Sequence, residues 1–387
     1  MRREGQPRLL LLGSQMAAGG AQHILLAQGK WFRENGYHVV VAFFYDKEGI
    51  QSKWEKNYDF GIVNLRAWQA GAGVVSNLLR LLRGMYRLHR LISRERLDVI
   101  ETFTHHSNLL GLPTAWIAGV PKRVGTHHGR PTMAPGLGGL HSFLANIGIM
   151  THLVAVSEQL RDEAEGSEGI QAKRIAVIVN GIVDCCADPT VQSAAPQVRS
   201  ELKVPEAGYL VLSVGRLVPE KGHIHLIEAM PRVLKRFPKT IFAFAGDGPL
   251  REALEQRVKE LTLESNVRLL GTRSDVPSLL AAADMFAYPS LREGCPLAVL
   301  EALSMRVPIV ASSFDGVTGI LEHRKTALLV PVGAPEELAA ALVEALESPQ
   351  QSRDLARAGA QTIAREFSMQ KMCQRYDKLF RTGSLAP

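Results

Sequence analysis

Short apolar runs alternate along the chain with longer stretches in which apolar residues return every three or four positions. The short runs predict buried strands, and the longer stretches predict helices with one apolar face. In the first half the expected strands are Arg8–Gly13, His38–Phe44, Gly61–Leu65, Asp98–Phe103, Arg123–Thr126, His152–Val156 and Ile175–Val179. In the second half they are Tyr209–Val214, Thr240–Ala245, Val267–Leu270, Met285–Tyr288, Pro308–Ala311 and Ala327–Val330. Because these runs are mostly unbroken, they favour parallel strands that helices cover on both faces.

The alternation of strands and helices predicts an α/β protein with doubly wound, Rossmann-like domains. The pattern is interrupted between Asp184 and Val204, where prolines and small polar residues follow no clear period. A length of 387 residues is enough for two domains with separate cores. We therefore expect an N-terminal domain over 1–184, a linker over 185–204, a C-terminal domain over 205–366, and a last helix over 367–387 that could cross back to the first domain. Because ligands bind at the carboxyl ends of the strands of such sheets, two facing sheets would share one interdomain cleft.

Two carboxylates flank the start of a predicted helix in the second half. The expected strand that ends at Tyr288 is followed by Glu293 on a turn, and Pro296 suits the first turn of the helix that carries Glu301. Free N–H groups at the start of a helix attract phosphate, and a carboxylate accepts hydrogen bonds from sugar hydroxyls. A crevice that offers both kinds of group fits a nucleotide sugar.

A cationic loop follows the expected strand Tyr209–Val214. It carries Arg216 and Lys221, which together suit a diphosphate, and Gly215 and Gly222 allow a tight turn and a close approach to a ligand. Taken alone, these cations could equally be solvated side chains on an ordinary loop. The glutamate pair nearby favours the ligand-binding interpretation.

Composition narrows the choice of partner only slightly. There are 45 basic and 38 acidic side chains, and this net charge of +7 favours anionic partners such as nucleotides or phospholipid surfaces. The cysteines are Cys185, Cys186, Cys295 and Cys373, with no Cys-x-x-Cys spacing, which argues against a disulfide framework or a zinc site. The first apolar run is too short for a signal peptide, and no window reaches the length of a transmembrane helix. We therefore expect a cytoplasmic protein, which would dock on the inner face of a membrane if its acceptor is a lipid.

Taken together, these motifs resemble the retaining glycosyltransferases of the GT-B fold, specifically family 4, also called group 1. The likeness runs over nearly the whole chain. Besides the residues above, it includes Gly246-Asp247-Gly248-Pro249, Val307–Ala311, Gly19-Gly20, Gly125-Thr126-His127-His128 and Asn180–Asp184. The resemblance implies two facing Rossmann-like domains with mainly parallel sheets and an interdomain cleft.

The resemblance also implies roles for single residues. Arg216 and Lys221 would hold the donor diphosphate, Glu301 would bind the ribose, and Glu293 would lie beside the donor sugar. The catalytic residues it implies are His127, Arg216, Lys221 and Glu293, with His127 favoured over His128 as the histidine that faces the sugar. The donor-binding residues it implies are Gly19, Gly20, Arg216, Lys221, Gly246, Gly294, Cys295, Pro296, Leu297 and Glu301.

The implied reaction moves a sugar from a nucleotide-diphosphate sugar to a hydroxyl of a glycan or lipid-linked acceptor, in the synthesis of cell-surface polysaccharide or glycolipid. No Asp-x-Asp occurs in the sequence, so we expect no required metal and no cofactor besides the donor, because fixed cations can stabilise the leaving diphosphate. Retention without an obvious second nucleophile suggests attack from the front face.

Five arginines recur at steps of three and four along the predicted helix Ser76–Arg96. They are Arg80, Arg83, Arg87, Arg90 and Arg94, with Leu78, Leu81, Leu82, Met85, Leu88 and Leu91 filling much of the other face. This pattern is typical of an ordinary helix with a solvated cationic face. It also fits a helix that binds an anionic membrane surface.

Three histidines in the first half are candidates for contact with the acceptor. His105 and His106 follow the strand Asp98–Phe103, where they could cap a helix, lie idle in a loop, or contact the acceptor together with His128. Asp247 lies between two glycines, and its simplest role is turn chemistry.

Two other classes of function remain open on the sequence alone. A sugar-nucleotide epimerase or a non-catalytic nucleotide-sugar-binding protein would share the fold and the crevice. A basic nucleic-acid-binding protein is disfavoured, because no RNP, KH or zinc-finger pattern is present.

Overall fold

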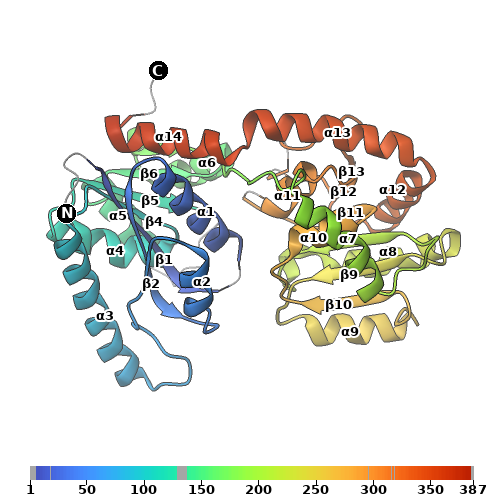
Figure 1. Cartoon of the computed structure of the whole chain (residues 1–387), viewed down its shortest axis with the longest axis horizontal. Coiled ribbons are helices and arrows are strands. Elements are labelled where there is room, and N and C mark those ends of the chain that lie inside the picture. Colours follow the sequence, from blue (N-terminus) through green and yellow to red (C-terminus); the bar gives the residue numbers. More distant parts are fainter. Residues whose placement is uncertain are drawn as a thin grey trace. The chain divides into compact units, whose positions relative to one another are not determined.

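The computed structural model describes residues 6–17, 19–128, 137–294, 296–314, 316–317 and 319–384. The chain forms two compact units (Figure 1). Unit 1 comprises Met1–Gly181 and Met369–Pro387, and unit 2 comprises Ile182–Ser368. Each unit is built on its own sheet, and all the strand pairs within the two sheets are parallel.

Unit 1 contains a seven-stranded sheet in the order β3-β2-β1-β4-β5-β6-β7. Its strands are β1 (Arg8–Met16), β2 (His38–Asp46), β3 (Gly61–Asn64), β4 (Val99–Thr102), β5 (Lys122–His127), β6 (His152–Ala155) and β7 (Ile175–Val177). Its helices are α1 (Gly20–Glu34), α2 (Gln51–Asn57), α3 (Val74–Glu95), α4 (His105–Ile117), α5 (Leu137–Asn146), α6 (Glu158–Gly166) and α14 (Met369–Thr382).

The apolar β1 run is buried on both faces of this sheet. Leu10 and Leu12 belong to a core that also holds residues of α3, α4, α5 and α6. Leu11 lies on the opposite face, where it approaches Gly29 of α1. Successive side chains of a strand point to opposite faces, so an unbroken apolar run requires this double cover.

Unit 2 contains a six-stranded sheet in the order β10-β9-β8-β11-β12-β13. Its strands are β8 (Leu210–Val214), β9 (Ile241–Ala245), β10 (Val267–Gly271), β11 (Met285–Tyr288), β12 (Ile309–Ser312) and β13 (Leu328–Val330). Its helices are α7 (Pro189–Glu201), α8 (His223–Arg236), α9 (Arg251–Glu260), α10 (Val276–Ala282), α11 (Leu297–Ser304), α12 (Pro335–Glu347) and α13 (Pro349–Glu366). One core faces α7, α10, α11 and α13, and the other faces α8, α9 and α12.

Every strand expected from the sequence is present, but the expected linker is wrong. Residues 185–204 contain helix α7, and its Val198 is buried in the core of unit 2 together with Leu202, which caps the end of the helix. The prolines misled the prediction, because Pro189 occupies the first turn, which tolerates it, and Asp188 caps that turn by accepting from the Thr190 N–H. The chain therefore passes directly from unit 1 to unit 2 at Gly181–Ile182.

Helix α14, at the end of the chain, belongs to unit 1. Its Tyr376 and Phe380 are buried, and the Phe380 ring lies 5.4 Å from the ring of Phe32 in α1. The Tyr37 hydroxyl donates a hydrogen bond to Asp377 at 2.6 Å. Unit 1 is thus completed by a segment that is synthesised after all of unit 2.

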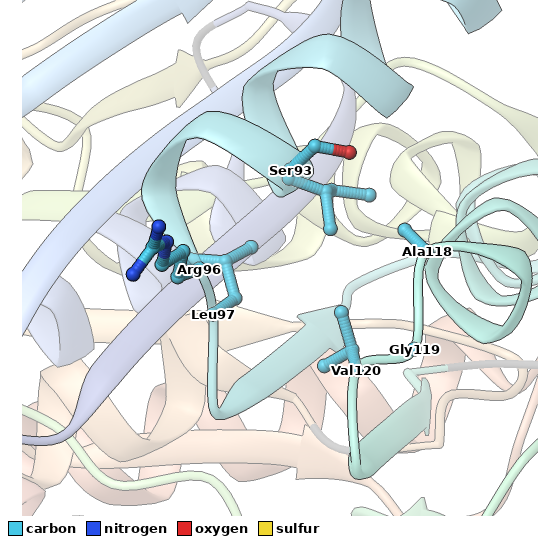
Figure 2. Close-up of a pocket in the computed structure, with 7 residues that line it drawn as sticks. Ser93, Arg96, Leu97, Ala118, Gly119 and Val120 are labelled. Atoms are coloured by element: carbon cyan, nitrogen blue, oxygen red, sulfur yellow. The ribbon is translucent and has the colours of Figure 1, made fainter.

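A cavity of about 370 Å³ opens beside the last turn of α3 in unit 1 (Figure 2). Its lining residues run over 92–97 and 118–120, just before β4 and β5. This is the amino-terminal edge of the sheet, whereas ligands of open α/β sheets bind at the carboxyl edge. None of the site residues expected from the sequence lines it.

Candidate functional site

The carboxyl edge of the unit 2 sheet brings two of the expected loops together. Strands β8 and β11 are neighbours in the sheet although they are far apart in sequence, and the strand order reverses direction between them. Such a reversal leaves a crevice at the carboxyl ends of the two strands. The loops that leave these strands are 215–222 and 289–296, and they carry Arg216, Lys221 and Glu293.

Gly222 fixes the course of the cationic loop. Its φ is +61°, and a Cβ added here would lie 2.1 Å from the carbonyl oxygen of Pro289 on the other loop. Gly215 leaves room in turn for the Lys221 side chain, which a Cβ at Gly215 would meet at 3.3 Å. The two glycines thus allow the loops to pack against each other, which places Lys221 between them.

Lys221 forms an ion pair with Glu293, and the side chains are only 15% and 22% exposed. The Lys221 ammonium also donates to the Tyr288 hydroxyl at 3.1 Å and lies 5.3 Å from the centre of the Tyr288 ring. A partly buried cation held by a carboxylate and an aromatic ring is positioned before any ligand arrives. Tyr288 was missed from the sequence, where it serves only as the last residue of a strand.

Arg216 lies on the same loop with an exposed side chain. The Gly246–Gly248 turn supports the loop from behind, because the Leu217 N–H donates to the Asp247 carbonyl at 3.0 Å. Gly246 has a φ of +151°, and a Cβ there would lie 1.9 Å from the Gly215 carbonyl oxygen. Asp247 accepts from the Gly248 N–H at 2.8 Å, which is the turn role expected for it.

Helix α11 begins at the same edge. Pro296 is its N-cap residue, and the Pro296 carbonyl accepts from the N–H groups of Val299 and Leu300. The N–H groups before them, in the first turn, have no partner within the helix. Gly294 and Leu297 are half-buried beside this turn, and Cys295 lies outside the described residues.

Glu301 lies further along α11 and is also half-buried. Burial raises the pKa of its carboxyl group to about 7. Among the described residues, no side chain or backbone group donates a hydrogen bond to this carboxylate, and its negative charge contributes to raising the pKa of the Cys185 thiol. Glu301 is therefore a desolvated acceptor for which the described part of the chain supplies no donor.

In unit 1 the sheet order reverses between β1 and β4. Gly19 and Gly20 follow β1 and are exposed, and the Gly19 carbonyl accepts from the His23 N–H at 2.9 Å as α1 begins. Gly19 has an extended backbone with φ of −167°, which any residue could adopt. The exposed start of α1 leaves backbone N–H groups at this edge.

The two adjacent histidines at the end of β5 differ in surroundings. His127 is 0% exposed, and its Nε2 lies 3.2 Å from the carboxylate of Glu168. His128 is half-buried, and its ring stacks on Phe103 at 5.6 Å. Burial lowers the pKa of both, that of His128 to about 4. Of the two, only His128 has surface that a ligand could reach.

His105 and His106 open helix α4 but do not cap it. The cap is Thr104, whose hydroxyl accepts from the Ser107 N–H at 3.3 Å. His106 is exposed, whereas the His105 ring packs against His127 at 4.4 Å and against His141 at 4.9 Å. His106 thus stays available to a ligand, and His105 belongs to a buried histidine cluster.

Helix α3 differs from the sequence expectation. Its buried residues form a narrow row of Asn77, Gly84, Leu88 and Ile92, and a Cβ at Gly84 would lie 2.5 Å from that of Ala67. Leu78 and Leu82, expected to pack inward, are 56% and 59% exposed. Because only this narrow row makes the contact, the helix leaves a wide apolar strip uncovered.

The arginines of α3 border that strip. Arg83, Arg87, Arg90 and Arg94 are exposed, and Arg80 is half-buried. Arg87 also donates from its guanidinium to the Leu65 carbonyl at 2.9 Å. Val74, Val75, Leu79 and Tyr86 extend the exposed apolar surface. In the described part of the chain, no helix combines the length and apolar content that crossing a bilayer requires.

Two family models together cover most of the chain. The model described as Glycosyltransferase Family 4 matches residues 18–184, and the model described as Glycosyl transferases group 1 matches residues 195–362. The chain belongs to the group 1 glycosyltransferases. Its two parallel α/β units are those of the GT-B fold.

Solved and curated proteins similar to this glycosyltransferase agree with the assignment. Anabaena Alr3699/HepE, solved with UDP and glucose, superimposes with a TM-score of 0.82 at 23% identity, over 97% of this chain and 100% of that one. The UDP-Gal:alpha-D-GlcNAc-diphosphoundecaprenol alpha-1,3-galactosyltransferase of Escherichia coli is 28% identical over 69% of this chain and 71% of its own length. The lipopolysaccharide core biosynthesis glycosyltransferase LpsD of Rhizobium meliloti is 32% identical over 49% of this chain and 54% of its own.

Proposed function

We propose that this glycosyltransferase moves a sugar, with retention of configuration, from a nucleotide-diphosphate sugar to a hydroxyl of a glycan or lipid-linked acceptor in cell-surface polysaccharide or glycolipid synthesis. The observation that carries this proposal is the Lys221–Glu293 ion pair at the reversal point of the unit 2 sheet. HepE has been solved in complex with UDP-glucose, and the E. coli relative's name specifies a UDP-sugar donor and a lipid-diphosphate acceptor. Both names support this substrate class.

In this proposal the cations of the loop after β8 bind the donor diphosphate. Lys221 and Arg216 provide positive charge, and the first turn of α11 provides N–H groups beside them. These groups stabilise the negative charge that develops on the leaving diphosphate, which is the role a metal would otherwise play. Glu301 accepts hydrogen bonds from the ribose hydroxyls, which supply the donors that its carboxylate lacks.

Glu293 has a positioning role. When the diphosphate arrives, Lys221 gains a second anionic partner, and Glu293 is left to accept a hydrogen bond from a sugar hydroxyl. A carboxylate neutralised by a lysine is a poor nucleophile, which supports attack from the front face. The acceptor oxygen then bonds to C1 as the C1–O bond to the diphosphate breaks, and the acceptor proton passes to the departing phosphate oxygen.

Residues of unit 1 also have roles in this proposal. Gly19 and Gly20 contribute backbone N–H groups toward the donor phosphate, and His106 contacts the acceptor. We assign the histidine that faces the sugar to His128 rather than His127, because His127 has no exposed surface.

The central test combines donor binding with turnover. UDP-, GDP-, ADP- and CMP-sugars are screened by thermal shift, and the stabilising donor is then incubated with candidate acceptors. We expect nucleoside diphosphate release together with a glycosylated product of unchanged anomeric configuration. Lys221→Ala and Glu301→Ala should each lower turnover by about 10²–10³-fold in a folded protein, as loss of one transition-state contact typically does.

Lys235→Ala provides the matched control, because Lys235 is exposed in the last turn of α8, away from the carboxyl edge. It should turn over as the wild type does. An epimerised sugar nucleotide, or donor binding with no product, would instead support the alternative of an epimerase or a binding protein. Near-normal turnover in both site variants would overturn the site assignment.

We also propose that α3 holds the enzyme on an anionic membrane surface. Its exposed leucines and Tyr86 offer an apolar strip, and Arg83, Arg90 and Arg94 lie exposed on the same helix. A helix that pairs exposed apolar residues with arginines suits the boundary between acyl chains and anionic headgroups. Such attachment would place the enzyme at the cytoplasmic side of a membrane that carries its acceptor.

Vesicle sedimentation tests this attachment. The protein should bind vesicles that contain anionic phospholipid and not purely zwitterionic ones. Replacing Arg83 and Arg90 together by Gln should weaken binding by about 30-fold, at about 1 kcal/mol for each cation. Arg353→Gln, on the exposed face of α13, should bind unchanged. Equal binding by the double variant and the wild type would show that α3 is not the contact.

A further inference from the structure

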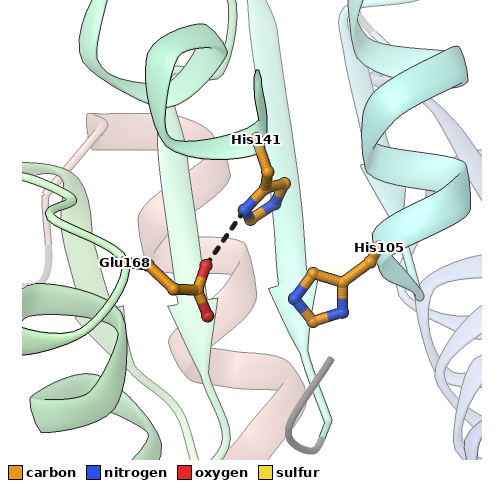
Figure 3. Close-up of side chains that lie close together, drawn as sticks. All are labelled: His105, His141 and Glu168. Carbon is orange, nitrogen blue, oxygen red and sulfur yellow. Dashed lines mark hydrogen bonds and ion pairs between the residues drawn. The ribbon is translucent and has the colours of Figure 1, made fainter. Parts of the chain in front are cut away.

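Three side chains outside the proposed donor site converge in unit 1 (Figure 3). They are His105 at the start of α4, His141 in α5, and Glu168 in the segment after α6. Each offers one nitrogen or oxygen atom, and these atoms all lie within 4.8 Å of one another. His141 is fully buried, and the Glu168 side chain is only 10% exposed. Nothing in the proposed transfer reaction uses this cluster.

We propose that His105, His141 and Glu168 bind a zinc ion that ties α4, α5 and the segment after α6 together. Two imidazoles with one carboxylate are typical zinc ligands, whereas magnesium and calcium prefer oxygen ligands alone. The fourth position of a tetrahedral site would be filled by water. The ligand is therefore a first-row divalent cation with a preference for nitrogen.

One distance within the cluster already suits a tetrahedral ion, and the other ligand atoms lie within 4.8 Å of one another. Zinc binds imidazole nitrogen and carboxylate oxygen at about 2.0–2.2 Å, so two of its ligand atoms lie about 3.3 Å apart in a tetrahedron. Nδ1 of His141 lies 3.2 Å from Oε2 of Glu168. This edge of the site already has the right length, and the ring of His105 points toward it from α4 (Figure 3).

The His105 ring has an unmet requirement that a metal would satisfy. Its Nε2 is buried, and no hydrogen-bond partner for it occurs among the described residues. A buried polar atom without a partner costs free energy.

Two further side chains are placed to orient the ligands. Nε2 of His127 lies 3.2 Å from Oε1 of Glu168, the oxygen that does not face His141. The Asn108 amide lies 3.1 Å from Nε2 of His141, on the far side of that ring from Glu168. Partners of this kind fix the tautomer and the direction of metal ligands.

Metal binding through Nδ1 would put a proton on Nε2 of His141, and Asn108 must then accept rather than donate. A rotated Asn108 amide achieves this, because its NH₂ group can then donate to the Thr102 hydroxyl, which now lies 2.5 Å from the amide oxygen. The rotation gives up only a long bond of 3.4 Å to the Thr126 carbonyl.

The ion would also influence the acceptor side of the enzyme without touching it. His105 is adjacent to His106 in the chain, and His127, whose Nε2 lies 3.2 Å from Glu168, is adjacent to His128. A zinc ion would hold both backbones in place at the carboxyl edge of β4 and β5. Metal binding at this site does not depend on the proposed reaction.

Metal binding by the full-length protein, without donor or acceptor, tests this site. Protein stripped with a chelator is titrated with Zn²⁺ against a chromophoric competitor, and with Co²⁺ for its visible absorption. We expect one ion per chain, intense Co²⁺ bands typical of four-coordinate geometry, and a higher melting temperature with Zn²⁺. Loss of a side chain that only hydrogen-bonds to a metal ligand typically weakens metal binding by about 10–100-fold. His105→Ala and Glu168→Gln remove a ligand itself, so each should weaken Zn²⁺ binding by more than this.

His38→Ala is the matched control, because His38 also pairs with a carboxylate, Glu95, at 3.0 Å, but no third ligand joins them among the residues that the structure describes. It should bind Zn²⁺ as the wild type does. Glu168→Gln keeps the size of the side chain, and circular dichroism confirms that each variant is folded. Binding of less than half an ion per chain by the wild type, or equal binding by His105→Ala and Glu168→Gln, would overturn the proposal.

Discussion

Glu101 in β4 carries a carboxyl group with no exposed surface inside unit 1. Gln28 of α1 donates to it at 2.6 Å, and Tyr376 of α14 forms a second hydrogen bond with it. Desolvation outweighs both bonds and raises the pKa of Glu101 to about 8. The group is therefore mainly protonated in the folded protein at neutral pH, whereas in the unfolded chain it ionises near its ordinary pKa of 4.5.

This difference predicts a pH dependence of stability. Between pH 4.5 and 8 the folded state holds a proton that the unfolded state has lost, so the free energy of unfolding should fall as pH rises through this range. Glu101→Gln removes the titration and should flatten the curve, with a gain over wild type of a few kcal/mol by pH 8. Urea unfolding of unit 1 at pH 5 to 8 measures the effect. Parallel curves for the two proteins would show that Glu101 does not titrate in this range.

The loop between β8 and α8 depends on Gly222, which combines a positive φ with a close approach to Pro289. Gly222→Ala should destabilise unit 2 by about 1–3 kcal/mol and move Lys221 away from Glu293, with lower turnover as a result. Gly271→Ala is the control, because Gly271 also has a positive φ of +69° but no backbone atom within 4 Å of its added Cβ. Thermal unfolding and turnover of the two variants separate backbone strain from the loop contact. Equal turnover loss in both would mean that the contact with Pro289 is unimportant.

The sequence predicted helices and strands correctly where the local pattern of apolar residues determines them. Unbroken apolar runs such as β1 and β9 identified parallel strands, because a strand covered on both faces has no polar positions. Helix α7 was missed because its prolines resemble a linker, whereas the buried Val198 and Leu202 become evident only when the core of unit 2 exists. The exposed strip on α3 was hidden for the same reason, since its pattern is that of a packed helix.

Some residues of the candidate sites could likewise be predicted from the sequence, whereas others depend on tertiary packing. Arg216, Lys221 and Glu293 stand next to strand ends, so the sheet order alone brings their loops together. The choice between His127 and His128 depends on which face of β5 is covered, and a single sequence does not contain that information. Glu168 follows no motif, and its approach to His105 and His141 depends on the packing of α4, α5 and α6 on one face of the sheet.

At the scale of the whole molecule, the chain order and the folding units do not coincide. Unit 1 needs α14, which follows unit 2 in the sequence, whereas unit 2 is continuous. Each unit has its own sheet and its own cores. We therefore expect two unfolding transitions in calorimetry of the full chain, because separate cores can melt separately.

Ligand and mutation should act on different transitions. Under the proposed function, UDP binds the loops after β8 and β11, so at one hundred times its Kd it should stabilise the unit 2 transition by about 2.7 kcal/mol. Phe380→Ala removes a buried ring of α14 from its contact with Phe32 and should destabilise the unit 1 transition by about 3–5 kcal/mol. UDP should still stabilise the unit 2 transition in this variant, since its site lies in the continuous unit. If UDP and Phe380→Ala instead shifted a single common transition, the two units would unfold as one, and α14 would couple the donor site to the stability of the whole enzyme.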